Sequence, residues 1–360
     1  MRPSPADAWV AEFVFINGRF LTQPMSGVQR YAREIVRALD QRPGGADRYV
    51  LLTPPGADSL NLLNISTRTI GRAGGHLWEQ TALAWAARHG RLLSLGGSGP
   101  VLHRRQIVVI HDAAVFRHPE HFRTGYAAFH RALNSTLARR ARLATVSDFS
   151  RRELASVLNL SPDSIAVAPN SADHLRIVTP DPAVIERLGL TTRPYFVALG
   201  NLTPNKNLAV AIRALSHLAD PAVRLVLIGD RPAVIFDRSA FPADPRLIVA
   251  GRRSDAEITA LLGGARGLVF PSLYEGFGIP PLEAITLGCP VIASDIPATR
   301  EVCADAALYF DPADDVALAA HMAELLSRPD VARRDAGLRR ADRYAWSRSA
   351  EVIEDLLLST

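Results

Sequence analysis

Short apolar runs alternate with stretches of helical periodicity along most of the sequence. Phe13–Ile16 is an apolar run, and Val28, Tyr31, Ile35 and Leu39 follow it at the spacing of one helix face. A strand that leads through a polar loop into an amphipathic helix is typical of a sheet wrapped by helices. The alternation therefore predicts an α/β fold.

The first half continues this rhythm with three more buried strands, predicted at Ile107–Ile110, Ala144–Val146 and Ile165–Ala168. The segment Ser150-Arg-Arg-Glu153 has the spacing of a capping box, which predicts that a helix begins there. Residues 171–193 carry Pro180 and Pro182 and have mixed polarity. We interpret them as a connection between two domains.

After this connection the strand and helix pattern starts again. The predicted elements are strands at Tyr195–Leu199, Arg224–Ile228, Leu247–Ala250, Gly267–Phe270 and Pro290–Ala293, and helices at Leu208–Leu218, Asp255–Leu262, Pro280–Leu287, 315–327, 331–343 and 347–358. A chain of 360 residues also exceeds what one core usually organises. We therefore expect two Rossmann-like domains that face a central cleft, where ligands sit at the carboxyl ends of the strands.

Composition excludes several classes of protein. The two cysteines, Cys289 and Cys303, provide no disulfide framework, zinc site or CxxC redox motif. No stretch approaches the roughly 18 apolar residues that span a bilayer, and Met1–Trp9 does not resemble a signal peptide. These features predict a cytoplasmic protein.

The charges are distributed unevenly. Residues 1–180 hold 22 basic and 13 acidic residues, whereas residues 181–360 hold 19 basic and 23 acidic residues. The first half is thus the candidate for meeting an anionic partner such as nucleic acid, a membrane surface or a phosphorylated substrate. A solvated basic face without a partner fits the same numbers.

Lys206 stands out because 40 of the 41 basic residues are arginine. It lies in the segment 200–207, between a predicted strand and a predicted helix, where a glycine and free helix N–H groups favour an anion. This pattern indicates a phosphate site, although it does not match the Walker A motif. An ordinary loop with a solvated lysine is the alternative.

Glu275 and Glu283 form a second cluster after the strand at Gly267–Phe270, with Gly276 and Gly278 between them. Two carboxylates at the mouth of a cleft can accept hydrogen bonds from vicinal hydroxyls or act as acid and base. The glycines let the backbone approach a ligand and donate N–H groups. Two unrelated surface glutamates would give the same spacing.

Two smaller candidates lie in the first half. His111 ends a central strand and could bind a hydroxyl, act as a base or serve only as a structural residue. Gly27 precedes the helix that contains Val28 and could approach an anion. The sequence lacks an Asp-x-Asp pair, a Gly-x-Ser-x-Gly elbow and a Gly-x-Gly-x-x-Gly fingerprint after its first strand.

Together these residues resemble the retaining GT-B glycosyltransferases of family four, which build bacterial surface polysaccharides and glycolipids. The most specific element is the Glu-x7-Glu motif, Glu275 to Glu283, followed by Gly288-Cys-Pro-Val-Ile-Ala-Ser-Asp295. The segments 26–31, 145–154, 168–170 and 204–207 match further landmarks of that family. The resemblance covers nearly the whole chain.

The resemblance implies a GT-B fold with an acceptor-binding domain at 1–178, a nucleotide-sugar domain at 179–345 and a C-terminal helix at 346–360 that packs back toward the first domain. It implies that Lys206 neutralises the donor diphosphate in place of a metal ion, and that Glu283 accepts from the ribose. No cofactor is expected.

Further roles follow from the same resemblance. Glu275, with Gly276 and the N–H groups of Phe277 and Gly278, would hold the transferred sugar. His111 would meet that sugar from the acceptor side, and Gly27 would approach the diphosphate. Main-chain groups of residues 251–254 or the side chain of Arg252 would contact the nucleobase. Asn201 would also belong to the donor-binding residues. Many relatives have an arginine at this position, so another arginine would supply the second cation here.

The function implied is a metal-independent retaining hexosyltransferase without a protein nucleophile. GDP-mannose is the first expected donor and a UDP-sugar the next, with a lipid-linked saccharide as acceptor. The basic first half would then contact the inner membrane, and no nucleic acid is expected because no binding motif accompanies the charge. The alternatives are a non-catalytic nucleotide-sugar-binding partner of a glycosyltransferase and a sugar-nucleotide epimerase.

Overall fold

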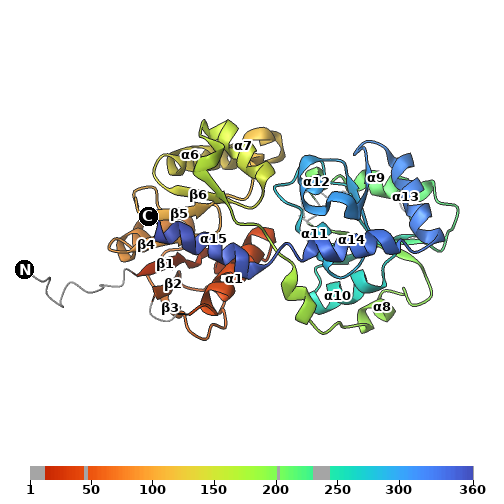
Figure 1. Cartoon of the computed structure of the whole chain (residues 1–360), viewed down its shortest axis with the longest axis horizontal. Coiled ribbons are helices and arrows are strands. Elements are labelled where there is room, and N and C mark those ends of the chain that lie inside the picture. Colours follow the sequence, from red (N-terminus) through yellow and green to blue (C-terminus); the bar gives the residue numbers. More distant parts are fainter. Residues whose placement is uncertain (1–12, 44–47, 201–202, 230–243, 360) are drawn as a thin grey trace, which may run out of the picture. The chain divides into compact units, whose positions relative to one another are not determined.

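The computed structural model describes residues 13–43, 48–200, 203–229 and 244–359. The chain forms two compact units (Figure 1): unit 1 comprises Met1–Asn170 and Trp346–Thr360, and unit 2 comprises Ser171–Ala345. The chain thus leaves unit 1 at residue 170, whereas the sequence predicted a boundary at 178. The reason is that Asp173–Ile177 forms a 3-10 helix that packs on a helix of unit 2.

Unit 1 contains a seven-stranded sheet in the order β3-β2-β1-β4-β5-β6-β7, and all of its pairs are parallel. The strands are β1 (Val14–Asn17), β2 (Tyr49–Thr53), β3 (Ser66–Thr69), β4 (Arg91–Ser94), β5 (Gln106–Val109), β6 (Arg142–Thr145) and β7 (Ile165–Val167). The sequence analysis missed β2, β3 and β4. The edge strand β3 is polar and exposed along its whole length, so it carries no apolar pattern.

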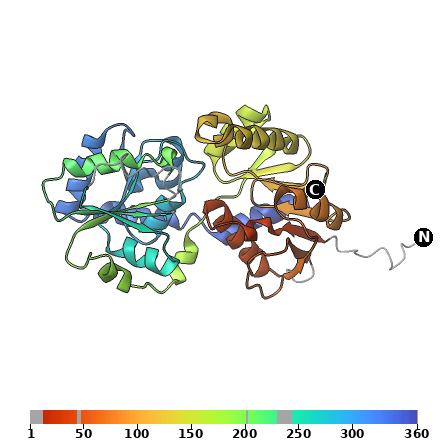
Figure 2. The same cartoon turned by 180° about the vertical axis from the view of Figure 1, so that it is seen from behind.

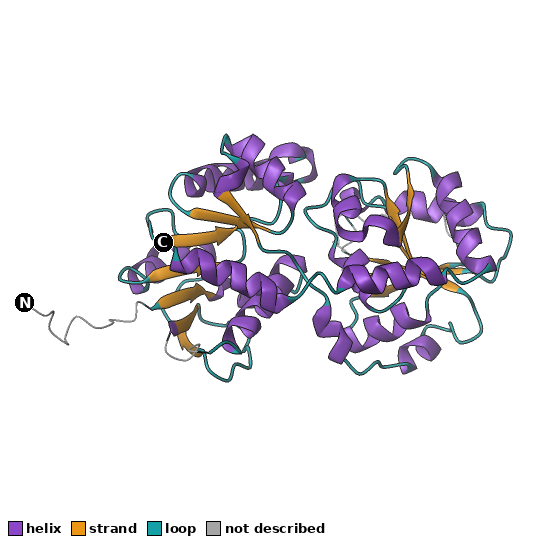
Figure 3. Cartoon of the chain, in the orientation of Figure 1, coloured by secondary structure: helices purple, strands orange, loops and turns teal. Residues whose placement is uncertain are grey.

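The main helices of unit 1 cover both faces of this sheet (Figure 3). They are α1 (Gly27–Asp40), α3 (Gly75–Trp78), the π-helical turn η3 (Glu79–Leu83), α4 (Ala84–Ala86), α5 (Ala114–Arg117), α6 (Thr124–Ala138), α7 (Asp148–Leu158) and α15 (Trp346–Leu358), with short 3-10 turns at Gly18–Thr22 (η2), Pro119–His121 (η4) and Pro162–Ser164 (η5).

The predicted apolar face of α1 is buried, with Tyr31, Ile35 and Leu39 fully shielded from solvent. The predicted start of α7 was wrong. Its N-cap is Ser147, whose hydroxyl accepts from the Ser150 N–H at 2.9 Å, so Ser150 lies inside the helix. An N-cap serine accepts a hydrogen bond from the backbone N–H three residues later. The capping-box spacing assigned this role to Ser150, whereas in the structure Ser147 has it.

The last helix, α15, belongs to unit 1, although it follows unit 2 in the sequence (Figure 1). Its Glu354 accepts hydrogen bonds from Arg42 Nε at 2.6 Å, from Arg48 Nη1 at 3.0 Å and from the Tyr49 hydroxyl at 3.0 Å. Trp346 packs edge-on against Tyr31 of α1, with 5.8 Å between the ring centroids. Burial and charge-assisted hydrogen bonds therefore hold α15 on unit 1.

Unit 2 contains a six-stranded parallel sheet in the order β10-β9-β8-β11-β12-β13. The strands are β8 (Tyr195–Leu199), β9 (Arg224–Ile228), β10 (Leu247–Gly251), β11 (Gly267–Phe270), β12 (Val291–Ser294) and β13 (Ala307–Phe310). The sequence analysis predicted five of these and missed β13.

Helices lie on both sides of the unit 2 sheet, as the view from behind shows (Figure 2). They are α8 (Ala183–Arg187), α9 (Leu208–Ser216), α10 (Asp255–Gly264), α11 (Ile279–Thr286), α12 (Pro297–Cys303), α13 (Asp315–Ser327) and α14 (Val331–Ala341), with 3-10 turns at Asp173–Ile177 (η6), Pro204–Lys206 (η7) and Ala304–Ala306 (η9).

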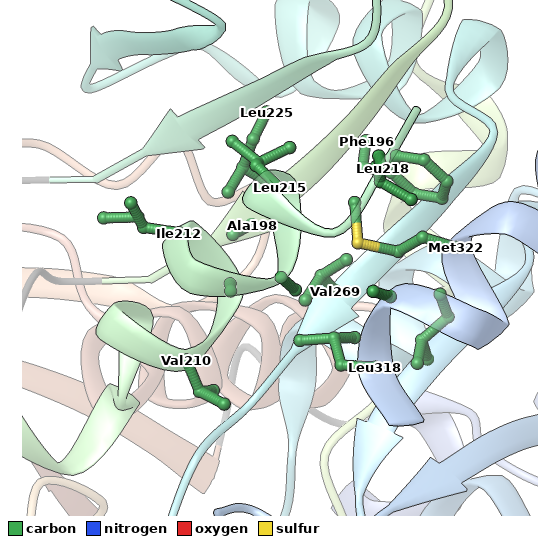
Figure 4. Close-up of a cluster of buried hydrophobic side chains, with 14 of the residues drawn as sticks. Phe196, Ala198, Val210, Ile212, Leu215, Leu218, Leu225, Val269, Leu318 and Met322 are labelled. Carbon is green, nitrogen blue, oxygen red and sulfur yellow. The ribbon is translucent and has the colours of Figure 1, made fainter. Parts of the chain in front are cut away.

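The core of unit 2 on one face of the sheet is built from alternate strand residues and from α9 and α13. Phe196 and Val269 on the strands meet Leu215 of α9 and Met322 of α13 (Figure 4). Each buried side chain of this size contributes roughly 1.5–3 kcal/mol relative to an exposed one. This packing fixes the strands whose carboxyl ends carry the polar residues described below.

No helix among the described residues is both long enough and apolar enough to cross a membrane.

Candidate functional site

Lys206 lies at the carboxyl end of β8 and folds back over the end of that strand. Gly200 has a φ of +141°, and its N–H donates to Ile228 O at 2.9 Å. A Cβ at Gly200 would lie 3.2 Å from the Lys206 Cε, so a side chain there would crowd the lysine stem. Glycine therefore serves both the backbone turn and the position of the ammonium. Asn201 lies outside the described residues.

The ammonium of Lys206 meets the carboxylate of Glu275, which follows the neighbouring strand β11. Nζ lies 2.5 Å from Glu275 Oε1, and the two side chains are 18% and 15% exposed. The two loops are also joined through the backbone, because the Leu273 N–H donates to Asn205 O at 2.8 Å. The structure thus brings together the lysine and the first glutamate that the sequence singled out separately.

Glu283 lies on α11, which begins just after Gly278. Gly278 caps this helix with a φ of +106°, and prolines occupy its first turn. Glu283 is 7% exposed, which leaves its carboxylate largely shielded from water. The ring of Phe277 is turned into the unit and packs edge-on against Tyr344 at 5.5 Å. Phe277 therefore presents its backbone, rather than its side chain, at the Glu275 loop.

A small cavity of about 10 Å³ lies beneath the Lys206 loop, with Gly200, Lys206, Phe270 and Ser272 among its lining residues. A space of this size is on the scale of one water molecule. The Ser272 hydroxyl is buried and has no hydrogen-bond partner within the described part of the chain. The loop that carries Lys206 thus covers a small, mostly apolar cavity into which a few polar groups are set.

Arg252 follows β10, which is separated from β8 by β9. Its side chain is exposed, whereas the neighbouring Arg253 donates to Ala250 O at 2.5 Å and lies 3.7 Å from Glu257. Ser254 and Glu257 form a capping box that starts α10. Arg252 therefore shares the carboxyl edge of the sheet with Lys206 but lies two strands away from it.

His111 follows β5 in unit 1. Its Nε2 lies 2.9 Å from Leu95 O, and because a carbonyl can only accept, Nε2 carries the proton. Burial lowers the pKa of His111 to about 4, so the ring is neutral near pH 7. The Nδ1 atom is then a hydrogen-bond acceptor. The ring packs edge-on against Tyr31 of α1 at 4.9 Å.

Gly27 is the first residue of α1 and is exposed. The preceding N-cap residue, Ser26, makes no side-chain bond to the helix N–H groups, because its hydroxyl bonds to the Gln29 side chain. The first turn of α1 thus has the polarity that favours an anion. Tyr31 connects this helix to the His111 ring.

The sequence analysis missed a buried carboxylate in unit 1, Glu79, which begins the π-helical turn η3. Glu79 is fully buried and accepts from Asn17 Nδ2 at 2.8 Å and the Ser98 hydroxyl at 2.8 Å. Arg19 Nε lies 3.0 Å from it, and His76 Nδ1 lies 2.8 Å from it. We call these five residues the Glu79 network.

The electrostatics of Glu79 favour its charged form. Burial on its own raises the pKa of Glu79, but the hydrogen bonds from His76 and Asn17 and the charge of Arg19 outweigh it and hold the pKa below its usual value. The sequence signal for this buried carboxylate was a single glutamate directly after Trp78, in a stretch whose residues otherwise indicate an ordinary helix. Its partners come from three other segments, which the sequence alone does not bring together.

Known proteins resemble this chain in sequence. Residues 182–340 match the model of the family described as glycosyl transferases group 1. The chain is 30% identical over 287 residues to O-antigen chain mannosyltransferase B of Escherichia coli, a match that covers 73% of each protein. It is also 28% identical over 237 residues to the O-antigen chain mannosyltransferase RfbU of Salmonella typhimurium, covering 65% of this chain and 64% of that relative.

Solved structures share the fold. Anabaena HepE in complex with UDP matches with a TM-score of 0.73 and 18% identity, covering 97% of this chain and 100% of that one. WaaG, described as a glycosyltransferase involved in lipopolysaccharide biosynthesis, matches with a TM-score of 0.71 and 16% identity, covering 96% and 99%. This chain therefore shares its fold, two Rossmann-like units that each contain a parallel sheet, with GT-B glycosyltransferases.

Proposed function

The chain belongs to the glycosyl transferases group 1 family and is a glycosyltransferase, and from this premise we propose that it transfers a hexose from a nucleotide sugar to a saccharide acceptor. We propose mannose from GDP-mannose as the first donor, because two relatives along most of the chain are O-antigen mannosyltransferases. A UDP-sugar is the second candidate, supported by the complex of HepE with UDP-glucose.

The observation that carries this proposal is the Lys206–Glu275 ion pair at the carboxyl ends of two adjacent strands. The ammonium is a compact charge that suits a diphosphate. When the donor binds, its diphosphate replaces the carboxylate beside Lys206, and Glu275 becomes available to accept hydrogen bonds from sugar hydroxyls. Lys206 thus contacts the phosphate side of the bond that breaks, and Glu275 contacts the sugar side.

We propose that transfer retains the configuration of the sugar. The bond between the anomeric carbon and the diphosphate breaks while the acceptor oxygen bonds to that carbon from the same face. The acceptor proton passes to the departing phosphate oxygen, so no protein nucleophile is required. Lys206 stabilises the charge that develops on the phosphate, and the neutral His111 offers Nδ1 to a sugar hydroxyl.

Other residues of the site have supporting roles in this proposal. Glu283 accepts from the ribose, the backbone of Gly276, Phe277 and Gly278 holds the sugar, and Gly27 approaches the diphosphate. Arg252, exposed after β10, contacts the nucleobase. We propose that no metal ion is needed, because Lys206 supplies positive charge beside the diphosphate.

The acceptor is proposed to be a lipid-linked saccharide or an oligosaccharide used in surface polysaccharide synthesis, as the names of the relatives suggest. The arginines on α1 are poor candidates for a membrane contact, because Arg33 pairs with Asp58 and Arg37 with Glu34. Arg139 and Arg140, which are exposed at the end of α6, are better ones. Each cation near an anionic surface contributes about 1 kcal/mol.

Thermal unfolding with GDP, UDP, ADP and CDP, each with and without EDTA, tests the proposal. A ligand at 100 times its Kd adds about 2.7 kcal/mol, which raises the midpoint by a few degrees in a protein of this size. We expect GDP to give the largest shift and EDTA to leave it unchanged. A shift that EDTA removes would contradict the proposal that no metal ion is needed. The absence of a shift with every nucleotide would contradict the proposal that the chain binds a nucleotide-sugar donor.

A further inference from the structure

Five aromatic rings gather at one place on unit 1, beside the Glu79 network. The His76 ring lies 4.8 Å from Phe129 and 5.5 Å from His130, and Tyr126 lies 4.2 Å from His130, measured between centroids. Phe122 stacks on Tyr126 at 5.7 Å. We call these five residues the ring cluster. Tyr126, Phe129 and His130 come from α6, Phe122 follows η4 just before that helix, and His76 comes from α3.

Two of these rings are open to solvent although α6 has a separate buried face. Tyr126 is 51% exposed and Phe129 is 46% exposed, whereas Ala127, Leu133 and Leu137 of the same helix are buried. The core therefore does not require aromatic residues at 126 and 129. Exposed, adjacent aromatic rings beside polar side chains are typical of ligand sites rather than of an idle surface.

The Glu79 network fixes one edge of the ring cluster. Glu79 accepts from His76 Nδ1 at 2.8 Å, so the other ring nitrogen, Nε2, points away from Glu79. The Glu79 carboxylate is held in turn by Asn17 and Arg19. A ring orientated by a buried carboxylate is preorganised, as ligand-binding side chains in proteins commonly are.

The cluster lies at the carboxyl edge of the unit 1 sheet. Asn17 is the last residue of β1, and His111 and Asp112 follow β5. Partial burial raises the pKa of Tyr126, and the nearby charge of Asp112 raises it further. The ring cluster and His111, which is proposed to contact the sugar, therefore both lie at the carboxyl edge of the unit 1 sheet.

The charged groups that act on Tyr126 and His130 carry both signs. Arg19 is balanced by Glu79, and Asp112 adds a further negative charge. Burial and the nearby charges of His76 and Arg19 lower the pKa of His130, so its ring is neutral near pH 7. This differs from the Lys206 loop, where the cation is matched to a diphosphate. A ligand for the ring cluster needs apolar faces and hydroxyls rather than phosphate.

We propose that the ring cluster binds an uncharged sugar ring of the acceptor. The apolar face of the sugar packs on Phe129 and Tyr126, and its hydroxyls form hydrogen bonds with His76 Nε2 and with His130. The inference rests on the proposed function, because it names the substrate class of the same reaction. It follows that the chain adds its hexose to an existing saccharide, and that a bare lipid phosphate is not its acceptor.

Saturation-transfer difference NMR on the full chain tests this inference, with methyl α-D-mannopyranoside, methyl α-D-glucopyranoside and mannose 6-phosphate as probes. The decisive variant carries Tyr126→Ala and Phe129→Ala, which both replace solvent-exposed rings. Loss of aromatic packing of this kind corresponds to about a five- to tenfold rise in Kd for the bound methyl glycoside. We expect mannose 6-phosphate to bind no more tightly than the uncharged sugars.

Trp85→Ala is the matched control. Trp85 is 68% exposed in the same unit and contacts Arg88, with the guanidinium 4.0 Å from its ring centroid, and it is not part of the ring cluster. We expect this variant to bind the methyl glycosides as the natural protein does. The titrations are repeated in Glu275→Ala protein, which removes the proposed contact with the donor sugar and so leaves the signal from unit 1.

Three outcomes would overturn the inference: no signal from any probe with the natural protein, an unchanged Kd in the double variant, or a phosphorylated sugar that binds more than tenfold tighter. Nucleotide binding by thermal unfolding separates these from failure of the proposed function. If the nucleotides shift the midpoint but the double variant binds sugars normally, only the ring cluster is wrong. If the double variant loses sugar binding but no nucleotide binds, only the donor assignment is wrong.

Discussion

The Lys206–Glu275 pair of unit 2 and the Glu79 network of unit 1 both place a carboxylate against a cation at the carboxyl ends of parallel strands, yet they are built in opposite ways. Glu275 is 15% exposed and, within the described residues, has Lys206 as its side-chain partner. Glu79 is fully buried and has four partners. A single, partly solvated contact can open for a ligand, whereas a buried and fully bonded carboxylate is fixed.

The largest expected effect separates the two carboxylates by stability. Glu79→Ala leaves Arg19 without its buried counter-charge, which typically costs 3–5 kcal/mol, whereas Glu275→Ala should cost about 1 kcal/mol. All four tryptophans belong to unit 1, so urea unfolding followed by tryptophan fluorescence reports on the unit that holds Glu79, while far-ultraviolet circular dichroism also follows unit 2, which holds Glu275. Equal losses from the two variants would remove the distinction between a fixed and an opening carboxylate.

The next effect concerns activity and runs the other way. Glu275→Ala should lower the rate of sugar transfer at least about 100-fold, as expected when a preorganised contact to the reacting sugar is lost, while GDP binding stays within about threefold. Measured transfer rates and nucleotide titrations of the same preparation give both numbers. Normal transfer by this variant would show that the Lys206 contact is the only task of Glu275.

Lys206→Ala removes the cation of the unit 2 ion pair and tests whether that cation binds the diphosphate. Hydrogen bonds to charged groups contribute about 1.5–3 kcal/mol, so the Kd of the nucleoside diphosphate should rise about 10- to 150-fold and that of the nucleoside should barely change. Lys206→Arg serves as a second variant that keeps the charge but not the compact shape. If nucleoside and nucleoside diphosphate lose affinity equally, the lysine does not bind the diphosphate.

The most gradual effect, spread over two pH units or more, is a pH dependence of the stability of unit 1. The pKa of His111 is about 4 in the folded chain and near 6.5 when unfolded, so between these values the unfolded chain binds more protons. The free energy of unfolding should therefore fall by up to about 1.4 kcal/mol per pH unit as the pH drops from 6.5 toward 4. His111→Asn should flatten that part of the profile, and an unchanged slope would contradict a lowered pKa of this ring.

The two sites also differ in how far the sequence could predict them. Lys206, Glu275 and Gly278 lie in short segments whose residue types indicate their chemistry, and β8 and β11 are adjacent strands, so the motifs converge. The Glu79 network joins residues 62 positions apart, from Asn17 to Glu79, through strands that the sequence analysis did not find. Without β4 in the predicted sheet, nothing placed Ser94 and Ser98 beside the end of β1.

Most strands with a clear apolar run were predicted, and the apolar, buried strands β2 and β13 are the exceptions. The missed strand β3 is exposed on every residue, and β4 begins with a half-buried arginine, so neither carries a clear apolar signal. The cap of α7 at Ser147 shows a different limit, because two serines three residues apart compete for one role. The choice between them depends on where the preceding strand ends, which is a tertiary property.

The return of α15 to unit 1 sets an order of events during synthesis. A ribosome releases residues 171–345, which make up unit 2, before it releases the helix that carries Trp346 and Glu354. Unit 2 therefore has its whole sequence while unit 1 still lacks the side chains that cover Tyr31 and pair with Arg42. The domain made first is completed last, and its unfinished surface is exposed for the whole time that unit 2 takes to emerge.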